Sequence, residues 1–108
     1  MPETNTSRAY GGIVTTGVQP ARLHGPGGKL LSKHAIQVKG VGAAPTSWSV
    51  TLEGSLDDTN WTVLATHAAT DGSSVSVVDK PVLHVRVNVG ALALGAATSI
   101  VVVAASAE

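Results

Sequence analysis

The strongest constraint on the fold lies in the segment from residue 83 to residue 89. Its apolar residues are Leu83, Val85, Val87 and Val89, and the residues between them are His84, Arg86 and Asn88. An alternation with a period of two puts apolar side chains on one face of a strand and polar side chains on the other. The segment therefore predicts a strand in a sheet with one buried and one polar face, as in many antiparallel sheets.

Weaker forms of this pattern recur along the chain between clusters of Gly, Pro, Asn, Asp and Ser. The predicted strands cover residues 13–18, 21–24, 34–39, 48–53, 61–65, 74–78, 83–89 and 98–105. The composition favours Val, Thr, Ala, Ser and Gly, which suits strands and turns better than helices. About seven to eight short strands at this spacing predict an all-β fold, an antiparallel β-sandwich or jelly roll.

The domain organisation follows from length and from the polar start of the chain. At 108 residues the chain suffices for one domain, which we place at residues 12–108. Residues 1–11 contain a single large apolar side chain, Tyr10, and predict a flexible N-terminal arm. The arm is either a disordered tail or a segment that orders on a partner. Ser7, Arg8 and Tyr10 are its candidate contacts, because Tyr and Arg are common anchors at interfaces.

Charge and cysteine content argue against several classes of partner. Seven basic and seven acidic residues are dispersed along the chain and give no net charge. We therefore expect no nucleic-acid partner and no binding to an acidic membrane.

The chain has no cysteine, so it contains neither disulfides nor thiolate metal sites. No secretory signal or spanning segment is evident, which predicts a protein made in the cytoplasm.

The run from Ile100 to Val103 is apolar at every position. A strand that is apolar on both faces has to be covered on both, within the domain or by another subunit. Val101 and Val103 are therefore candidate contacts with a partner.

Motifs for catalysis are weak. The loop from His24 to Lys29, HGPGGK, lacks the spacing of a phosphate-binding loop and the Ser or Thr that should follow its Lys. No Ser stands in a nucleophile-elbow context. We therefore predict a protein without enzymatic activity, with no catalytic residues and no cofactor.

Histidines and acidic residues are the remaining candidates for a metal site. The four histidines, at positions 24, 34, 67 and 84, form no pair with the local spacing of metal ligands, although convergence over long distances stays open. In the loop with Asp57, Asp58 and Asn60, the adjacent carboxylates diverge and make a poor cage for calcium. Asp and Asn here are typical of a turn stabilised by their own backbone. We expect no metal site.

The two tryptophans are predicted as structural anchors. Alternation puts Trp48 on one face with Val50, and Trp61 on one face with Val63, so both indoles are expected in the core. The alternative is a platform on which a sugar ring stacks.

One part of the chain resembles known families. VTLEGSLDDTNWTVLA, followed after a turn by KPVLHVRVNV, resembles small tailed-phage virion proteins, in which a hairpin with the pattern EGS-D---W--L precedes a strand of the type RYVRVNV. It is also similar to discoidin-like and carbohydrate-binding modules. Asp58 replaces the glycine usual after Asp57, and Leu83 and His84 replace the Arg-Tyr pair.

The resemblance implies a function in the virion. We expect a phage structural protein, a capsid decoration protein that binds the outside of the major capsid protein lattice and stabilises it. Such a protein would be a homo-oligomer, with a trimer favoured because shells offer threefold positions. The alternatives are a carbohydrate-binding or adhesion module of the virion, and another head-tail or tail component.

Overall fold

The fold consists of strands arranged in two layers. The computed structural model describes residues 5–19, 22–68 and 74–108, which form nine strands and one 3-10 turn. The strands are β1 (Asn5–Ile13), β2 (Gly17–Val18), β3 (Leu23–His24), β4 (Lys33–Val41), β5 (Ser47–Ser55), β6 (Thr62–His67), β7 (Ser74–Val77), β8 (His84–Ala93) and β9 (Ser99–Ala107), and the turn is η1 (Pro26–Gly28). In these ranges no helix has the length and apolar character needed to cross a membrane.

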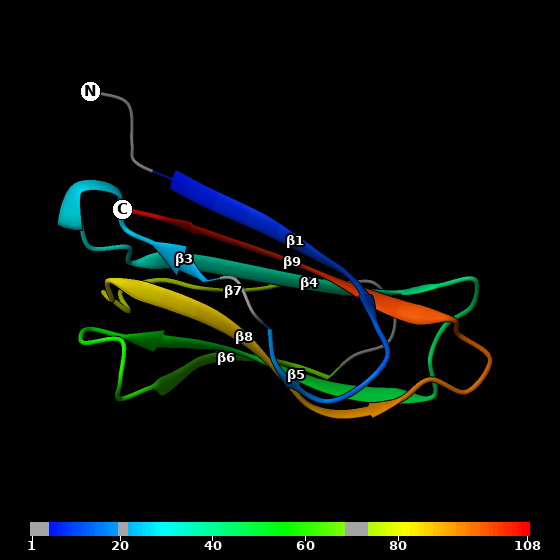
Figure 1. Cartoon of the computed structure of the whole chain (residues 1–108). Helices are drawn as coiled ribbons and strands as arrows, with labels where there is room; N and C mark the ends of the chain where they lie inside the picture. Colours follow the sequence, from blue (N-terminus) through cyan, green and yellow to red (C-terminus); the bar gives the residue numbers. More distant parts are fainter. Residues whose placement is uncertain (1–4, 20–21, 69–73) are drawn as a thin grey trace.

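Two antiparallel sheets pack face to face (Figure 1). The first sheet has the order β1-β9-β4-β7, and the second has the order β2-β8-β5-β6 with β3 also paired to β8. The inner faces of the sheets together bury one apolar cluster. The predicted all-β sandwich is therefore confirmed, with about nine short strands instead of seven to eight.

Strand β9 occupies an inner position of the first sheet, between β1 and β4. Its residues Ile100, Val102 and Ala104 are fully buried between the sheets. Val101 and Val103 point to the opposite, outer face, where Val101 is half-buried and Val103 is 40 % exposed. The part of the chain that the structure describes thus covers only one face of this apolar strand.

The N-terminal arm is the first correction. Residues 5–11, predicted to be flexible, belong to strand β1, which pairs antiparallel with β9. Tyr10 is buried opposite Val102, so it anchors the strand to the core and is not available to a partner. This segment is poor in apolar side chains, but a strand at the edge of a sheet needs apolar residues only on its inner face. Residues 1–4 lie outside the described residues.

The second sheet is organised by β8, whose alternation is confirmed. Val85, Val87 and Val89 are fully buried or nearly so, and the polar residues between them lie on the outer face. β8 pairs with β5 along most of its length and continues to Ala93, beyond the predicted end of this strand at residue 89; the register skips Gly90. The predicted hairpin between residues 48–53 and 61–65 is also present, since β5 pairs with β6.

Strand β6 changes phase at Leu64, so its first residues have the opposite phase to the predicted one. A register shift between Leu52 and Glu53 leaves Leu64 as an extra residue between two paired positions. Leu64 is therefore buried, while Val63, predicted to point inward, is 54 % exposed. A shift by one residue exchanges the two faces of a strand, which explains the error.

Candidate functional site

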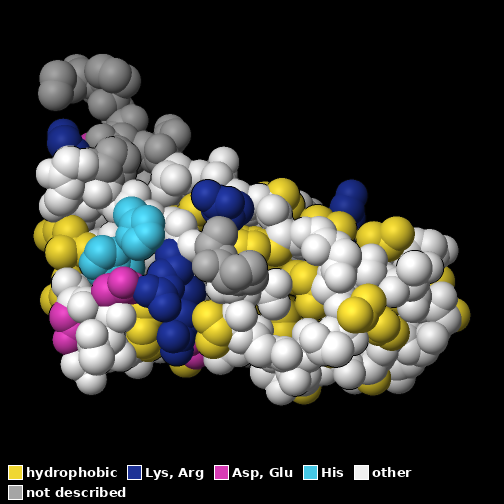
Figure 2. Space-filling model, in the orientation of Figure 1, with side chains coloured by type: hydrophobic (Ala, Val, Ile, Leu, Met, Phe, Trp, Pro, Cys, Tyr) yellow, Lys and Arg dark blue, Asp and Glu magenta, His cyan; other side chains and the backbone are white. Residues whose placement is uncertain are grey.

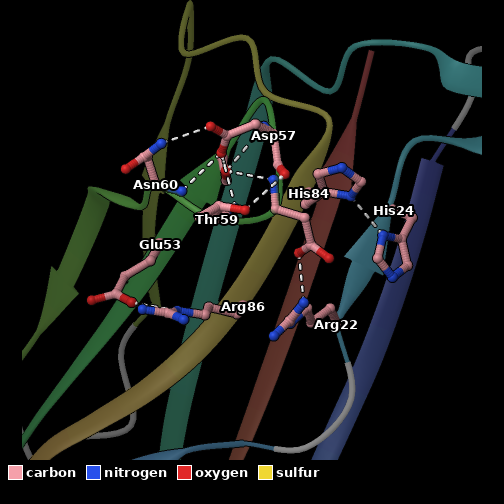
Figure 3. A network of polar contacts seen from close by, with 10 residues as sticks. Arg22, His24, Glu53, Asp57, Thr59, Asn60, His84 and Arg86 are labelled. Carbon is pink, nitrogen blue, oxygen red and sulfur yellow. Dashed lines mark hydrogen bonds and ion pairs between the residues drawn. The ribbon is translucent and has the colours of Figure 1, made fainter.

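Several charged side chains, two histidines and one tryptophan gather on the outer face of the second sheet. We call this set the polar face; it comprises Arg22, His24, Glu53, Asp58, Trp61, His84 and Arg86. Figure 3 labels Arg22, His24, Glu53, His84 and Arg86 of this set. They come from β3 and its preceding residue, from β5, from the loop between β5 and β6, and from β8. Figure 2 shows histidines, acidic groups and a band of basic side chains next to each other on this side of the molecule.

A partly buried ion pair stands at the centre of the polar face. Arg86 Nε donates to Glu53 Oε1 at 2.7 Å, and the two side chains are only 21 % and 13 % exposed. The other carboxylate oxygen accepts from Asn88 Nδ2 at 3.3 Å and from the Thr51 hydroxyl at 3.4 Å. Cross-strand pairing of Glu53 with Arg86 sets up this contact, because partners in register point to the same face.

Trp61 lies on the polar face and not in the core, which corrects its predicted role as a core anchor. The guanidinium carbon of Arg86 lies 4.2 Å from the indole centroid, and that of Arg22 lies 5.2 Å from it. Both distances are typical of cation–π contacts. Trp61 therefore holds two cations beside the sheet and stays half-buried. Trp48, in contrast, is buried as predicted.

The acidic loop is a turn, as predicted, and Asp57 stabilises it. Asp57 Oδ1 accepts from the backbone N–H groups of Asn60 at 2.8 Å and Thr59 at 2.9 Å, while Oδ2 accepts from Asn60 Nδ2 at 2.7 Å. The Ser55 hydroxyl donates to Asp57 Oδ1 and accepts from the backbone N–H groups of Asp57 and Asp58. The backbone N–H of Asn60, followed by that of Thr59, holds the pKa of Asp57 far below its usual range. The four hydrogen bonds that this carboxylate accepts all come from residues 55–60, so they stabilise the turn.

Asp58 has a different role from its neighbour. It adopts the left-handed conformation with φ 61°, which glycine favours. Its carboxylate accepts from Arg22 Nη1 at 2.6 Å. An aspartate here therefore joins the turn to the chain before β3, at the cost of some backbone strain.

Two histidines meet across the strand pair β3–β8. His24 and His84 are partners in register, and their Nδ1 atoms lie 2.8 Å apart. The rings meet edge to face, with centroids 5.0 Å apart and an interplanar angle of 79°. Two histidines that are distant in the sequence thus come together in the fold, a possibility that the sequence analysis left open. The alternation in β8 placed His84 on a polar face, but no sequence signal identified β3 as its neighbour.

The other two histidines are buried and have structural contacts. His34 Nε2 donates to the Lys80 carbonyl at 2.8 Å, and its Nδ1 lies 2.8 Å from the Ser106 hydroxyl. Burial lowers the pKa of His34 because it disfavours the charged ring. Trp48 Nε1 donates to His67 Nδ1 at 3.0 Å inside the core.

The predicted partner contacts fall on the first sheet. Ser7, Val101 and Val103 lie on its outer face, where Ser7 is in register with Ala105. A shallow depression of about 490 Å³ crosses this face near Ser7 and Ala105. Arg8 is exposed but lies in register with the buried Ala104, so it belongs to the edge and not to this face.

The described residues offer no assembly of three or more His, Asp or Glu side chains able to hold a metal ion. The HGPGGK segment starts in β3 with His24 and contains the turn η1, closed by a hydrogen bond from the Gly28 N–H to the Gly25 carbonyl. Gly27 and Gly28 both have positive φ, which suits glycine.

Comparison with known proteins gives no assignment. No protein-family model matches the chain, and no curated protein matches it significantly in sequence.

Proposed function

We propose that this chain is a structural protein of a bacteriophage particle, a decoration protein that binds the outside of the capsid lattice without catalysing a reaction. The hairpin and strand between Trp48 and Val89 support the phage setting through their resemblance to virion proteins. The proposed location is the capsid surface, and the proposed partner is the major capsid protein.

The outer face of the first sheet is the proposed docking surface, and one observation carries this choice. Val103, in a strand with neighbours on both sides, is 40 % exposed on a face without covering elements in the described structure. The residues around it are mostly small and uncharged: Ser7, Ala9, Ala35, Gln37, Ser76, Val101 and Ala105. Lys39, exposed in register with Val101, adds one positive charge to this face. A broad face of this kind suits contacts over a large area, and its burial removes apolar surface from water.

Decoration stabilises a shell by mass action. A protein that binds the assembled lattice and not the free subunits shifts the assembly equilibrium by its binding free energy at each site. Closed oligomers on a shell adopt the local symmetry, and a homotrimer fits the threefold positions. We therefore expect three copies to assemble before or during docking.

The test is cosedimentation of the purified chain with empty shells made of the major capsid protein from the phage that encodes it. Val103→Glu should abolish sedimentation with the shells, because it places a charge in the proposed contact. Val63→Glu is the matched control, since Val63 is 54 % exposed on the outer face of the second sheet. Light scattering after size-exclusion chromatography gives the oligomeric state.

Wild-type chain that stays in the supernatant would refute the decoration function. Equal binding by Val103→Glu and wild type would refute the docking surface, and loss of binding only in Val63→Glu would move it to the second sheet.

A glycan-binding module is the second candidate, favoured by the position of Trp61 outside the core. Sugar rings stack on exposed indole faces, but Arg86 lies 4.2 Å from the centroid of this indole. A glycan would have to share or displace that contact. Titration with capsular or cell-wall polysaccharide, followed by Trp61 fluorescence in Trp48→Phe, tests this function; an unchanged spectrum excludes stacking on Trp61.

A further inference from the structure

We propose that His24 and His84 form a two-histidine binding site for a divalent transition-metal ion of the Cu²⁺, Ni²⁺ and Zn²⁺ class. The site would use the Nδ1 atom of each ring, with water at the remaining positions. It stands on the geometry of the pair alone and is independent of the proposed capsid function.

The separation of the two nitrogens suits one ion. Metal–imidazole bonds are about 2.0–2.1 Å long, so two cis ligands lie about 2.9 Å apart at a right angle and about 3.3 Å apart at the tetrahedral angle. The Nδ1 atoms lie 2.8 Å apart. In the hydrogen-bonded pair the Nδ1 atoms point toward each other, so both rings have to turn off the N···N line before their lone pairs converge on an ion. His24 is exposed and His84 is half-buried, so an ion can approach from solvent.

The protons balance without an additional reactant. In the metal-free pair, one Nδ1 carries a hydrogen and donates it to the other Nδ1. Two Nδ1 atoms without a hydrogen between them would repel each other at 2.8 Å. When the ion binds, the donor ring carries its proton on Nε2 instead, by exchange with solvent. Both rings are then neutral imidazoles with free Nδ1 lone pairs, the form that binds metals.

The backbone holds both histidines in place. Their register pairing is extended by a hydrogen bond from the Gly25 N–H to the Leu83 carbonyl at 2.9 Å, and the Leu83 N–H donates to the Ser55 carbonyl at 3.0 Å. Only glycine fits at position 25, since a Cβ there would overlap the Lys29 carbonyl oxygen. Ligands on paired strands need little reorganisation before they bind an ion.

The charges next to the pair do not repel a cation strongly. Arg22 and Arg86 stand two residues from His24 and His84, and each is paired with a carboxylate, Asp58 at 2.6 Å and Glu53 at 2.7 Å. These two cations are therefore locally neutralised. With two protein ligands the site fits borderline ions that prefer imidazole, whereas Ca²⁺ and Mg²⁺ require more oxygen ligands.

Isothermal titration of the tag-free chain with Ni²⁺, Cu²⁺ and Zn²⁺ chlorides at about pH 7.5, where a free imidazole is neutral, tests the site. We expect one ion per chain and a rise in Tm with metal concentration. His24→Ala and His84→Ala should each weaken binding about tenfold or more. Val18→Ala is the matched control, because Val18 is exposed on β2, which pairs with the same strand β8; its affinity should be unchanged.

A second measurement uses only the wild-type chain, so it does not depend on whether the alanine variants fold. In ¹⁵N NMR spectra of the wild-type chain, Zn²⁺ should shift the Nδ1 signals of His24 and His84 and leave the buried His34 and His67 unchanged. Absence of binding up to millimolar metal, wild-type affinity in either alanine variant, or shifts confined to other groups would each overturn the proposal.

Discussion

The indole nitrogen of Trp48 donates a hydrogen bond to Nδ1 of His67 at 3.0 Å, and both side chains are buried between the sheets. Trp61, the other tryptophan, lies on the outer face beside Arg86. The two indoles therefore report on two different environments.

Single-tryptophan variants should separate these environments. In Trp61→Phe, where Trp48 alone emits, we expect a blue-shifted spectrum that acrylamide quenches weakly. In Trp48→Phe, where Trp61 alone emits, the spectrum should be red-shifted and quenching stronger, because the ring is half-buried. Trp48→Phe should also lower the free energy of unfolding by about 1–3 kcal/mol, since His67 Nδ1 loses its donor. Equal quenching of the two variants would contradict the placement of Trp61.

The ion pair between Arg86 and Glu53 should contribute more to stability than the one between Arg22 and Asp58. Removing Arg86 leaves a largely buried carboxylate, so Arg86→Ala should cost about 1–3 kcal/mol of unfolding free energy. Arg22→Ala is the matched control: it breaks a more exposed pair beside the same indole and should cost about 0–1 kcal/mol. Urea denaturation measures both, and a larger loss in Arg22→Ala would refute the ranking.

Gly54 should not tolerate a side chain. A Cβ at this position would lie 2.7 Å from Val82 Cγ1 and 2.9 Å from Leu64 Cδ1, both packed in the core. Gly54→Ala should therefore lower the free energy of unfolding by about 1–3 kcal/mol through overpacking. Gly90→Ala serves as control, because its Cβ would meet only the Ser49 carbonyl at 3.6 Å; we expect a change within about 0.5 kcal/mol. Equal melting temperatures of the two variants would contradict this packing.

Stability should fall on acidification because of His34. Burial lowers the pKa of this ring from 6.5 in the folded state, so below pH 6.5 the unfolded chain binds more protons than the folded chain. The contribution of neutral His34 is fully present above pH 6.5 and is lost as the pH falls toward its folded-state pKa. His34→Gln should remove this dependence. Unfolding free energies of wild type and His34→Gln, measured across this range, should converge at low pH; a constant difference would exclude the mechanism.

The sequence predicted those parts of the fold in which alternation is unbroken. Val85, Val87 and Val89 lie inside, because β8 pairs with β5 through most of its length without a change of phase. The phase of β6 could not be predicted, since the extra residue Leu64 arises only when β5 and β6 pair. Trp61 was misplaced for the same reason.

Strand β1 shows a second limit of sequence patterns. Its segment is polar and rich in small residues, and it forms a strand because β9 offers it an edge. Likewise, the pairing of His24 with His84 depends on sheet order, over a separation of 60 residues. Periodicity identifies the faces of a strand but not its neighbours.

The order of the first sheet determines when it can form during synthesis. β1 and β4 do not pair with each other, and both pair with β9. Until the ribosome has made residues 99–107, β1 has none of the main-chain partners seen in the sheet, and β4 has only β7. The second sheet can assemble before that point, since β5, β6 and β8 all precede β9. Nascent chains should therefore expose the inner face of a preformed second sheet until β9 inserts, which makes the insertion of one strand the step that protects the chain from aggregation.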